Sequence, residues 1–136
     1  IRNNLTSELG FSKEHRDLNV HRVAYVASEI TKHGGVAICS LIAPYAQARD
    51  KARDLISQNG TFIEIHVATD LATCEDRDIK GLYQKARAGV LKNFTGIDDP
   101  YEIPERAEIE LDTKNKTAEA CAEEVVAYLR TQQLLS

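Results

Sequence analysis

The sequence predicts an α/β fold in which a parallel β-sheet is flanked by helices. Three short apolar runs, at residues 36–41, 62–67 and 107–111, have the length and content of buried strands. Segments with helical spacing separate these runs, and a helical crossover is what parallel neighbours require. The chain has 136 residues with 43% hydrophobic content, so we expect one core and one domain over residues 1–136.

The first helix is predicted over about residues 12–33. Ser12 can cap its N-terminus, and Gly34-Gly35 ends it. The apolar residues expected along its buried side are Leu18, Val23, Val26, Ala27 and Ile30. Residues 36–41 follow as a continuous apolar run, which is typical of a strand that is buried on both faces.

A second helix is predicted over about residues 44–57, because Pro44 suits the first helical turn and Asn59-Gly60 can end it. The segment FIEIHV at 62–67 is the next predicted strand.

Two short helices are expected in the second half of the chain, over about 71–75 and 82–88. The third predicted strand covers residues 107–111. Thr117 then caps a last helix that reaches about residue 134. The side chains expected on the inner face of this helix are Cys121, Val125, Tyr128 and Leu129.

A basic cluster stands out because the chain as a whole has a formal net charge of -4. Its cations are Arg77, Lys80, Lys85, Arg87 and Lys92. A local basic patch on an acidic domain favours a compact anionic ligand over a nucleic-acid surface. Glycines interrupt the same stretch, which suits a segment that closes over a ligand. A solvated charged loop is the alternative on charge alone.

Cys39, Cys74 and Cys121 are isolated thiols without metal-ligand spacing, and we expect them to be buried in apolar packing. The four histidines also lack such spacing, so no metal site is predicted from them. No apolar run approaches the 18 residues of a membrane span. A reducing cytoplasm is the setting that these features favour.

Residues 77–104 read RDIKGLYQKARAGVLKNFTGIDDPYEIP. The parts KGLYQKARAG and FTGIDDPYE resemble the lid and substrate loop of the adenylylsulfate kinase family. Further matches are Arg2, the pair Gly10-Phe11, Arg16 and Asn19, which have the spacing of the family's N-terminal motif. The segment SLIAPY at 40–45 is similar to the family's SFISPY.

The resemblance implies a P-loop kinase-like parallel sheet with flanking helices and a lid and substrate loop at about 77–104. It also implies phosphorylation of adenosine 5′-phosphosulfate at the ribose 3′-hydroxyl by ATP, in sulfate assimilation. No GxxxxGK[ST] phosphate loop occurs in these residues. We therefore expect the family's first two strands and its P-loop to be missing from this chain, and the chain alone to be inactive.

The resemblance also implies substrate-binding residues, which we expect only at positions of this sequence that match the family's motifs. Arg2 and Arg16 are expected to bind oxyanions, since a guanidinium fork binds them in two places at once. Asn19 lies one helical turn after Arg16 and is expected to offer its amide to the base or ribose. Phe11 and Phe94 are expected on opposite sides of one cleft with the adenine between them. Core packing is the alternative for each ring.

Other positions are expected to act through the backbone or on the nucleotide phosphates. The backbone at Ile42 is expected to contact the adenine. Lys80 is expected to neutralise phosphate charge as the lid closes, which makes it the catalytic candidate. Arg77 is the weaker candidate for ATP, because an ion pair with Asp78 would occupy it. Ala43 stands where some members have a serine that can be phosphorylated, and alanine excludes a phosphoenzyme route there.

ATP and Mg²⁺ are the cofactors that the family implies, with the metal held by the missing segment. A homodimer is expected, a fusion to or partnership with ATP sulfurylase is left open, and neither nucleic acid nor membrane is expected as a partner. One alternative is a non-catalytic nucleotide-binding homologue that regulates an attached ATP sulfurylase. A nucleoside-monophosphate kinase with another acceptor is a third reading, against which the FTGIDDPYE loop argues.

Overall fold

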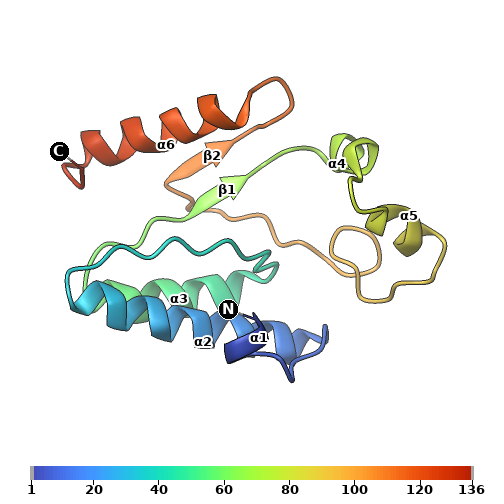
Figure 1. Ribbon diagram of the computed structural model, residues 1–136, viewed down its shortest axis with the longest axis horizontal. Coiled ribbons are helices and arrows are strands. Elements are labelled where there is room, and N and C mark those ends of the chain that lie inside the picture. The colour runs from blue at the N-terminus through green and yellow to red at the C-terminus, as the bar shows by residue number, and fades with distance from the viewer. Residues whose placement is uncertain (1, 136) are drawn as a thin grey trace. The chain divides into compact units, whose positions relative to one another are not determined.

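The computed structural model describes residues 2–135, which form two compact units. The first unit comprises the described residues up to 62 together with 92–103, and the second comprises 63–91 and the described residues from 104 onward. The elements, labelled in Figure 1, are α1 (Arg2–Leu5), α2 (Lys13–Lys32), α3 (Ala46–Ser57), β1 (Ile65–Val67), α4 (Leu71–Arg77), α5 (Leu82–Arg87), β2 (Ile109–Leu111) and α6 (Ala118–Thr131).

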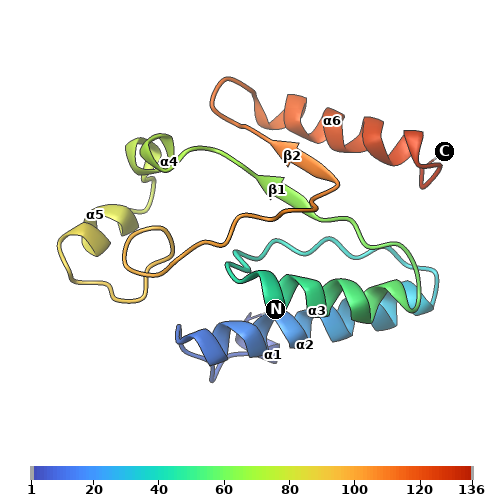
Figure 2. The ribbon, with the colours of Figure 1, turned by 180° about the vertical axis from the view of Figure 1, so that it is seen from behind.

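The first unit is built on the packing of α2 against α3, which lie side by side in Figures 1 and 2. The buried residues of this core are Val20, Ala24, Ala27, Tyr45, Ala48, Ala52 and Ile56. Their spacing of three, four and seven or eight positions along each helix puts them on one stripe that faces the partner helix. Gly60 also lies close to α2, since a Cβ there would collide with Thr31 Cγ2.

The predicted start of α2, with Ser12 as its N-cap, is confirmed. Ser12 Oγ accepts a hydrogen bond from the backbone N–H of His15 at 3.3 Å, as expected for a capping serine. The buried face differs in part from the expected one, because Leu18, Val26 and Ile30 are exposed. Since α3 covers the stripe that contains Val20 and Ala24, the neighbouring apolar positions are left at the surface.

The second unit contains the parallel sheet, and this confirms the predicted α/β class. Strands β1 and β2 pair in parallel with Ile65 opposite Ile109 and Val67 opposite Leu111. The helices α4 and α5 lie in the connection between the strands. Helix α6 covers the sheet from one side, where Cys121 packs against Ile109 and Leu111. Its N-cap is Thr117, whose Oγ1 accepts from the Ala120 N–H at 3.1 Å.

The predicted strand at 36–41 does not form. These residues are extended without strand pairing, and Val36 and Ile38 are 84% and 91% exposed. An apolar run becomes a strand only when a neighbouring strand takes its backbone hydrogen bonds, and none of the described residues supplies one there. Cys39 lies in this segment and is exposed, so its predicted burial was wrong, whereas Cys121 is buried as expected.

The other element boundaries differ by a few residues. The second helix begins at Ala46, with Tyr45 as its N-cap, so Pro44 precedes it. Both strands are shorter than predicted and keep only the residues that pair with each other. Helix α4 continues to Arg77, beyond the predicted end at 75.

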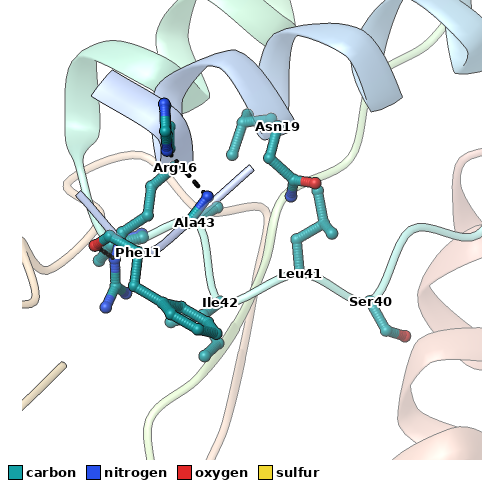
Figure 3. A pocket seen from close by; sticks show the side chains of 11 residues that line it. Phe11, Arg16, Asn19, Ser40, Leu41, Ile42 and Ala43 are labelled. Atoms are coloured by element: carbon teal, nitrogen blue, oxygen red, sulfur yellow. Dashed lines mark hydrogen bonds between the residues drawn. The ribbon is translucent and has the colours of Figure 1, made fainter. Parts of the chain in front are cut away.

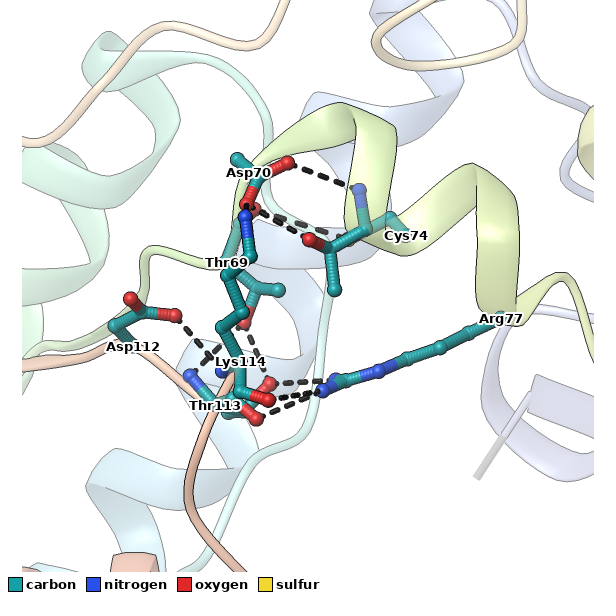
Figure 4. Close-up of polar contacts among 8 residues, drawn as sticks. Thr69, Asp70, Cys74, Arg77, Asp112, Thr113 and Lys114 are labelled. Atoms are coloured by element: carbon teal, nitrogen blue, oxygen red, sulfur yellow. Dashed lines mark hydrogen bonds and ion pairs between the residues drawn. The ribbon is translucent and has the colours of Figure 1, made fainter.

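Asp70 joins α4 to the loop after β2 (Figure 4). Its carboxylate caps the helix, because Oδ1 accepts from the Thr73 N–H at 2.9 Å and Oδ2 accepts from the Thr73 hydroxyl at 2.8 Å. Lys114 Nζ lies 3.1 Å from the same Oδ2. The hydrogen bonds from Thr73, followed by Lys114, lower the pKa of Asp70 to about 2.

We predict that Asp70 makes the stability of the protein depend on pH in the acid range. Its folded pKa of about 2 is below the ordinary aspartate value of about 3.9, so the folded state holds fewer protons in between. The contribution is therefore complete above about pH 5 and is lost as the pH falls toward 2. Asp70→Asn should keep a helix cap but lose this dependence. Urea unfolding midpoints from pH 6 to 2 measure it.

Asp54→Asn is the matched control, since Asp54 is an exposed aspartate on α3. Its midpoints should fall with pH as those of the wild type do. If Asp70→Asn falls with pH as steeply as the wild type, the Asp70 contacts do not contribute to stability.

Candidate functional site

A pocket of about 230 Å³ opens in the first unit, between the start of α2 and the chain that leads into α3 (Figure 3). The residues that line it are Gly10, Phe11, His15, Arg16, Asn19, Val20, Ser40, Leu41, Ile42, Ala43 and Pro44. Four positions that the sequence singled out for substrate binding are among them, namely Phe11, Arg16, Asn19 and Ile42. The motif GFSKEHRDLN and the motif SLIAPY thus form the two walls of one site.

Phe11 stands at the mouth of this pocket with 61% of its surface exposed. The turn before α2 presents it, because the Gly10 N–H donates to His15 Nδ1 at 2.8 Å and Arg16 Nε donates to the Phe11 carbonyl at 2.9 Å. A ring this exposed contributes little to a core. An exposed aromatic ring is suited to stacking on a flat ligand group.

Arg16 is bound to the loop at 93–95 from the same unit. Its Nη1 donates to Thr95 Oγ1 at 2.5 Å, and its Nη2 donates to the Asn93 carbonyl. Together with the bond to Phe11, three of the five N–H groups of the guanidinium are used. Within residues 2–135, the remaining N–H on each terminal nitrogen has no partner and is available to an oxyanion.

The opposite wall carries a strained backbone. Ala43 has φ +39°, in the left-handed region that costs a non-glycine residue about 1–2 kcal/mol. Arg49 holds it there, because its Nη1 donates to the Ala43 carbonyl at 2.8 Å and its Nη2 donates to the Glu102 carbonyl at 2.6 Å. This turn exposes Ile42, whose side chain is 65% accessible, and leads the chain from the pocket into α3.

Phe94 is half-buried and lies in a tight turn outside the residues that line the pocket. Asp98 caps this turn, since its carboxylate accepts from the Asn93 N–H at 2.9 Å and from the Phe94 N–H at 2.6 Å. These bonds, followed by a backbone contact of its own, hold the pKa of Asp98 below its usual range. The pairing of Phe94 with Phe11 across a cleft stays a prediction.

Arg2 lies in α1, and its side chain falls outside the described residues. The two candidates for ATP lie in the second unit. Lys80 is exposed in the turn between α4 and α5, and within the described residues its ammonium has no hydrogen-bond or ion-pair partner. Arg77 ends α4, where Nη1 donates to Thr113 Oγ1 at 2.8 Å and Nη2 donates to the Thr113 carbonyl at 2.8 Å (Figure 4).

The ion pair considered between Arg77 and Asp78 does not occupy Arg77. The Asp78 carboxylate instead accepts from the Tyr83 and Gln84 N–H groups at 3.0 Å and thereby caps α5. These backbone bonds lower the pKa of Asp78, with the bond from Gln84 as the largest cause. Arg77 therefore links α4 to the loop after β2, next to the Asp70–Lys114 pair.

The sequence did not place His15 or Tyr45 among the site residues, although His15 lines the pocket. Tyr45 belongs to the motif SLIAPY, and its single O–H is shared between the two carboxylate oxygens of Asp99, at O···O distances of 2.9 and 2.8 Å. Asp99 lies in the FTGIDDPYE motif. Both residues of this contact therefore belong to motifs that the sequence singled out, but nothing in the sequence shows that the two motifs are in contact.

No group of three or more histidine, cysteine, aspartate or glutamate residues is arranged to bind a metal within residues 2–135. In the same range, no helix combines the length and the apolar content needed to cross a membrane.

Comparison with known sequences gives consistent matches. A sequence model described as Adenylylsulphate kinase matches residues 1–112. An adenylyl-sulfate kinase of Halothermothrix orenii is 50% identical over 129 residues, which are 95% of this chain and 68% of that protein. A sulfate adenylyltransferase of Aspergillus oryzae is 47% identical over 132 residues, which are 97% of this chain and 23% of that protein. The chain thus spans about a quarter of the sulfate adenylyltransferases it matches.

Solved structures agree with these matches. The Mycobacterium tuberculosis APS kinase in complex with AMPPNP and APS is 38% identical and superposes with a TM-score of 0.90, over 95% of this chain and 75% of that one. A hexameric APS kinase from Thiobacillus denitrificans is 39% identical, with a TM-score of 0.75 over 99% of this chain and 22% of that one.

The strained turn at Ala43 yields a stability prediction. Ala43→Gly should raise the free energy of unfolding by up to about 1 kcal/mol, because glycine removes the left-handed penalty of about 1–2 kcal/mol and adds back some unfolded-state entropy. Ala127→Gly, at an exposed site inside α6, is the matched control and should lower it by about 1 kcal/mol. Urea unfolding compares the two. Equal losses would show that the turn at Ala43 carries no strain.

Proposed function

Because the chain belongs to the adenylylsulphate kinase family, we propose that it serves in the phosphorylation of adenosine 5′-phosphosulfate at its ribose 3′-hydroxyl by ATP. The product of this reaction is 3′-phosphoadenosine 5′-phosphosulfate. The observation that carries the proposal is the pocket in which Phe11, Arg16 and Asn19 meet the turn at Ile42.

The chemistry of the pocket suits the sulfate-nucleotide substrate. The exposed side chain of Phe11 is suited to stacking on adenine, and two N–H groups of Arg16 remain for the oxyanions of the phosphosulfate. Asn19 adds an amide that both donates and accepts. The volume of about 230 Å³ is below the range of about 300–1,000 Å³ for whole small-molecule sites, so we propose that it takes the adenosine part.

ATP is proposed as the phosphoryl donor, in line with the AMPPNP in the solved complex of the Mycobacterium tuberculosis relative. Lys80 is the residue we propose for its phosphates, because its ammonium is exposed and unpaired within residues 2–135. Arg77 already binds the Thr113 carbonyl and is the weaker candidate. We propose residues 77–104 as the lid and substrate loop. The described residues hold no cluster of histidine, cysteine, aspartate or glutamate side chains that fits Mg²⁺.

A regulatory role is a second candidate, and the match to sulfate adenylyltransferases favours it. This chain covers 23% of such a protein at 47% identity. A domain of this kind attached to an adenylyltransferase could bind the nucleotide without transferring phosphate. Self-association is also proposed, with the hexameric relative as its support. A cytoplasmic setting stays a prediction.

Arg16→Ala should weaken binding of adenosine 5′-phosphosulfate by about 1.5–3 kcal/mol, the range for a hydrogen bond to a charged group. Binding of ATP should change much less, because Arg16 lines the pocket proposed for adenosine 5′-phosphosulfate, whereas Lys80 is the residue proposed for ATP. Calorimetric titration of both ligands into the 136-residue chain measures this. Arg22→Ala is the matched control, because Arg22 lies on the same helix and binds Leu5 O and Glu8 outside the pocket. An equal loss for both ligands in Arg16→Ala would refute the assignment.

The 136-residue chain alone should bind adenosine 5′-phosphosulfate and fail to phosphorylate it. Its sequence has no GxxxxGK[ST] motif, so no backbone cradle positions the β- and γ-phosphates of ATP. A coupled assay with ATP, magnesium and adenosine 5′-phosphosulfate tests this. Turnover near ordinary kinase rates of roughly 1–100 per second would show that other residues of this chain position the phosphates.

A further inference from the structure

The phenol of Tyr45 connects the pocket wall to a distant segment of the first unit. Tyr45 directly follows Pro44, which lines the pocket, and its side chain is 3% exposed. Its single O–H is shared between the two carboxylate oxygens of Asp99, at O···O distances of 2.9 and 2.8 Å. Burial, followed by the hydrogen bond and charge of Asp99, raises the pKa of Tyr45 to about 12. The phenol therefore keeps its proton and stays a donor at physiological pH.

Asp99 ends the compact turn at residues 93–99. Inside this turn the Gly96 N–H donates to the Asp99 carbonyl at 2.8 Å, and the Phe94 carbonyl accepts from the Ile97 N–H at 3.0 Å. The Asp98 carboxylate closes it by accepting from the N–H groups at its start. Because the bonds run from one end to the other, the turn is expected to move as one body.

Arg16 binds the start of the same turn. Its Nη1 and Nη2 donate to Thr95 Oγ1 and to the Asn93 carbonyl, while its Nε donates to the Phe11 carbonyl. The turn is therefore tied at Arg16 to the α2 wall of the pocket and at Tyr45 to the other wall. Because Thr95 Oγ1 and the Asn93 carbonyl each accept one N–H of the Arg16 guanidinium, they determine which of its N–H groups remain for a ligand.

We propose that Tyr45 is a positioning residue of the sulfate-nucleotide pocket, acting through Asp99 and the 93–99 turn on the orientation of Arg16. The proposal rests on the proposed function. Without the hydroxyl, the partly buried Asp99 carboxylate loses the hydrogen bond that its two oxygens share, and leaving such a group unsatisfied is costly. The turn then loosens, and the guanidinium loses the fixed acceptors that aim it into the pocket.

The ring and the hydroxyl of Tyr45 have separable roles. The ring packs in the core of α2 and α3, and Lys13 Nζ lies 4.9 Å from its centroid. Tyr45→Phe keeps this packing and removes only the link to Asp99. Tyr25→Phe removes a hydroxyl from a 57% exposed tyrosine of α2 and is the matched control.

The first test titrates adenosine 5′-phosphosulfate and ATP into the two variants of the 136-residue chain. Tyr45→Phe should raise the dissociation constant for adenosine 5′-phosphosulfate roughly tenfold and leave that for ATP unchanged. Tyr25→Phe should match the wild type. Asp99→Asn, which keeps an acceptor for the phenol, should lose less affinity than Tyr45→Phe. An unchanged constant in Tyr45→Phe would overturn the proposal.

A double-mutant cycle tests whether Tyr45 acts through Arg16. In the Arg16→Ala background, Tyr45→Phe should weaken binding far less than it does alone, because the group that it orients is gone. Additive losses would overturn the proposed route.

Amide hydrogen exchange of the unliganded protein gives a readout that needs no substrate. Tyr45→Phe should speed exchange at Phe94 and Gly96 several-fold and leave α6 unchanged. Unchanged exchange at both would overturn the link between Tyr45 and the turn. If the wild-type chain binds no adenosine 5′-phosphosulfate while exchange responds as expected, the proposed function fails and the link survives.

Discussion

The packing of α2 on α3 is the interaction on which the candidate site depends. Alanines and aliphatic side chains of both helices bury one another, and this contact fixes the two helix starts. Arg16 and Asn19 occupy the first turns of α2, and Tyr45 caps α3. The pocket lies between these starts because the chain enters both helices from the same side of the unit. The apolar contact therefore sets the spacing of the polar groups.

The polar bonds of the first unit serve a different purpose. Arg49 and Tyr45 bind the 99–102 segment, and Arg16 binds the start of the 93–99 turn. The Glu102 carboxylate also accepts from the Ala46 N–H at 2.6 Å, so it occupies an otherwise unpaired donor at the start of α3. These charged contacts are directional, and they hold an irregular segment where apolar packing alone would leave it loosely placed.

Much of the secondary structure was predictable, because it depends on short-range signals. Ser12, Asp70 and Thr117 each accept from the N–H three positions ahead, which is a local geometry that the residue types favour. Apolar runs separated by helices predicted a parallel sheet with strands at 62–67 and 107–111, and residues 65–67 and 109–111 of these runs do pair in parallel. The strand predicted at 36–41 failed for a non-local reason, since strand formation depends on a neighbour that the apolar pattern cannot reveal.

The sequence by itself determined the α/β class, the family and the residue types that surround the pocket. The spacing of the motif residues can be read along the chain without any knowledge of tertiary contacts, and it is enough to identify the family and these residue types. Only the tertiary structure decided how those residues are used. Arg16 donates three of its N–H groups to other residues of the protein, and Arg77 binds the loop after β2. Tyr45 donates a hydrogen bond to Asp99, which lies 54 positions later in the sequence. Such partners depend on the packing of helices and loops, which the order of residues along the chain does not display.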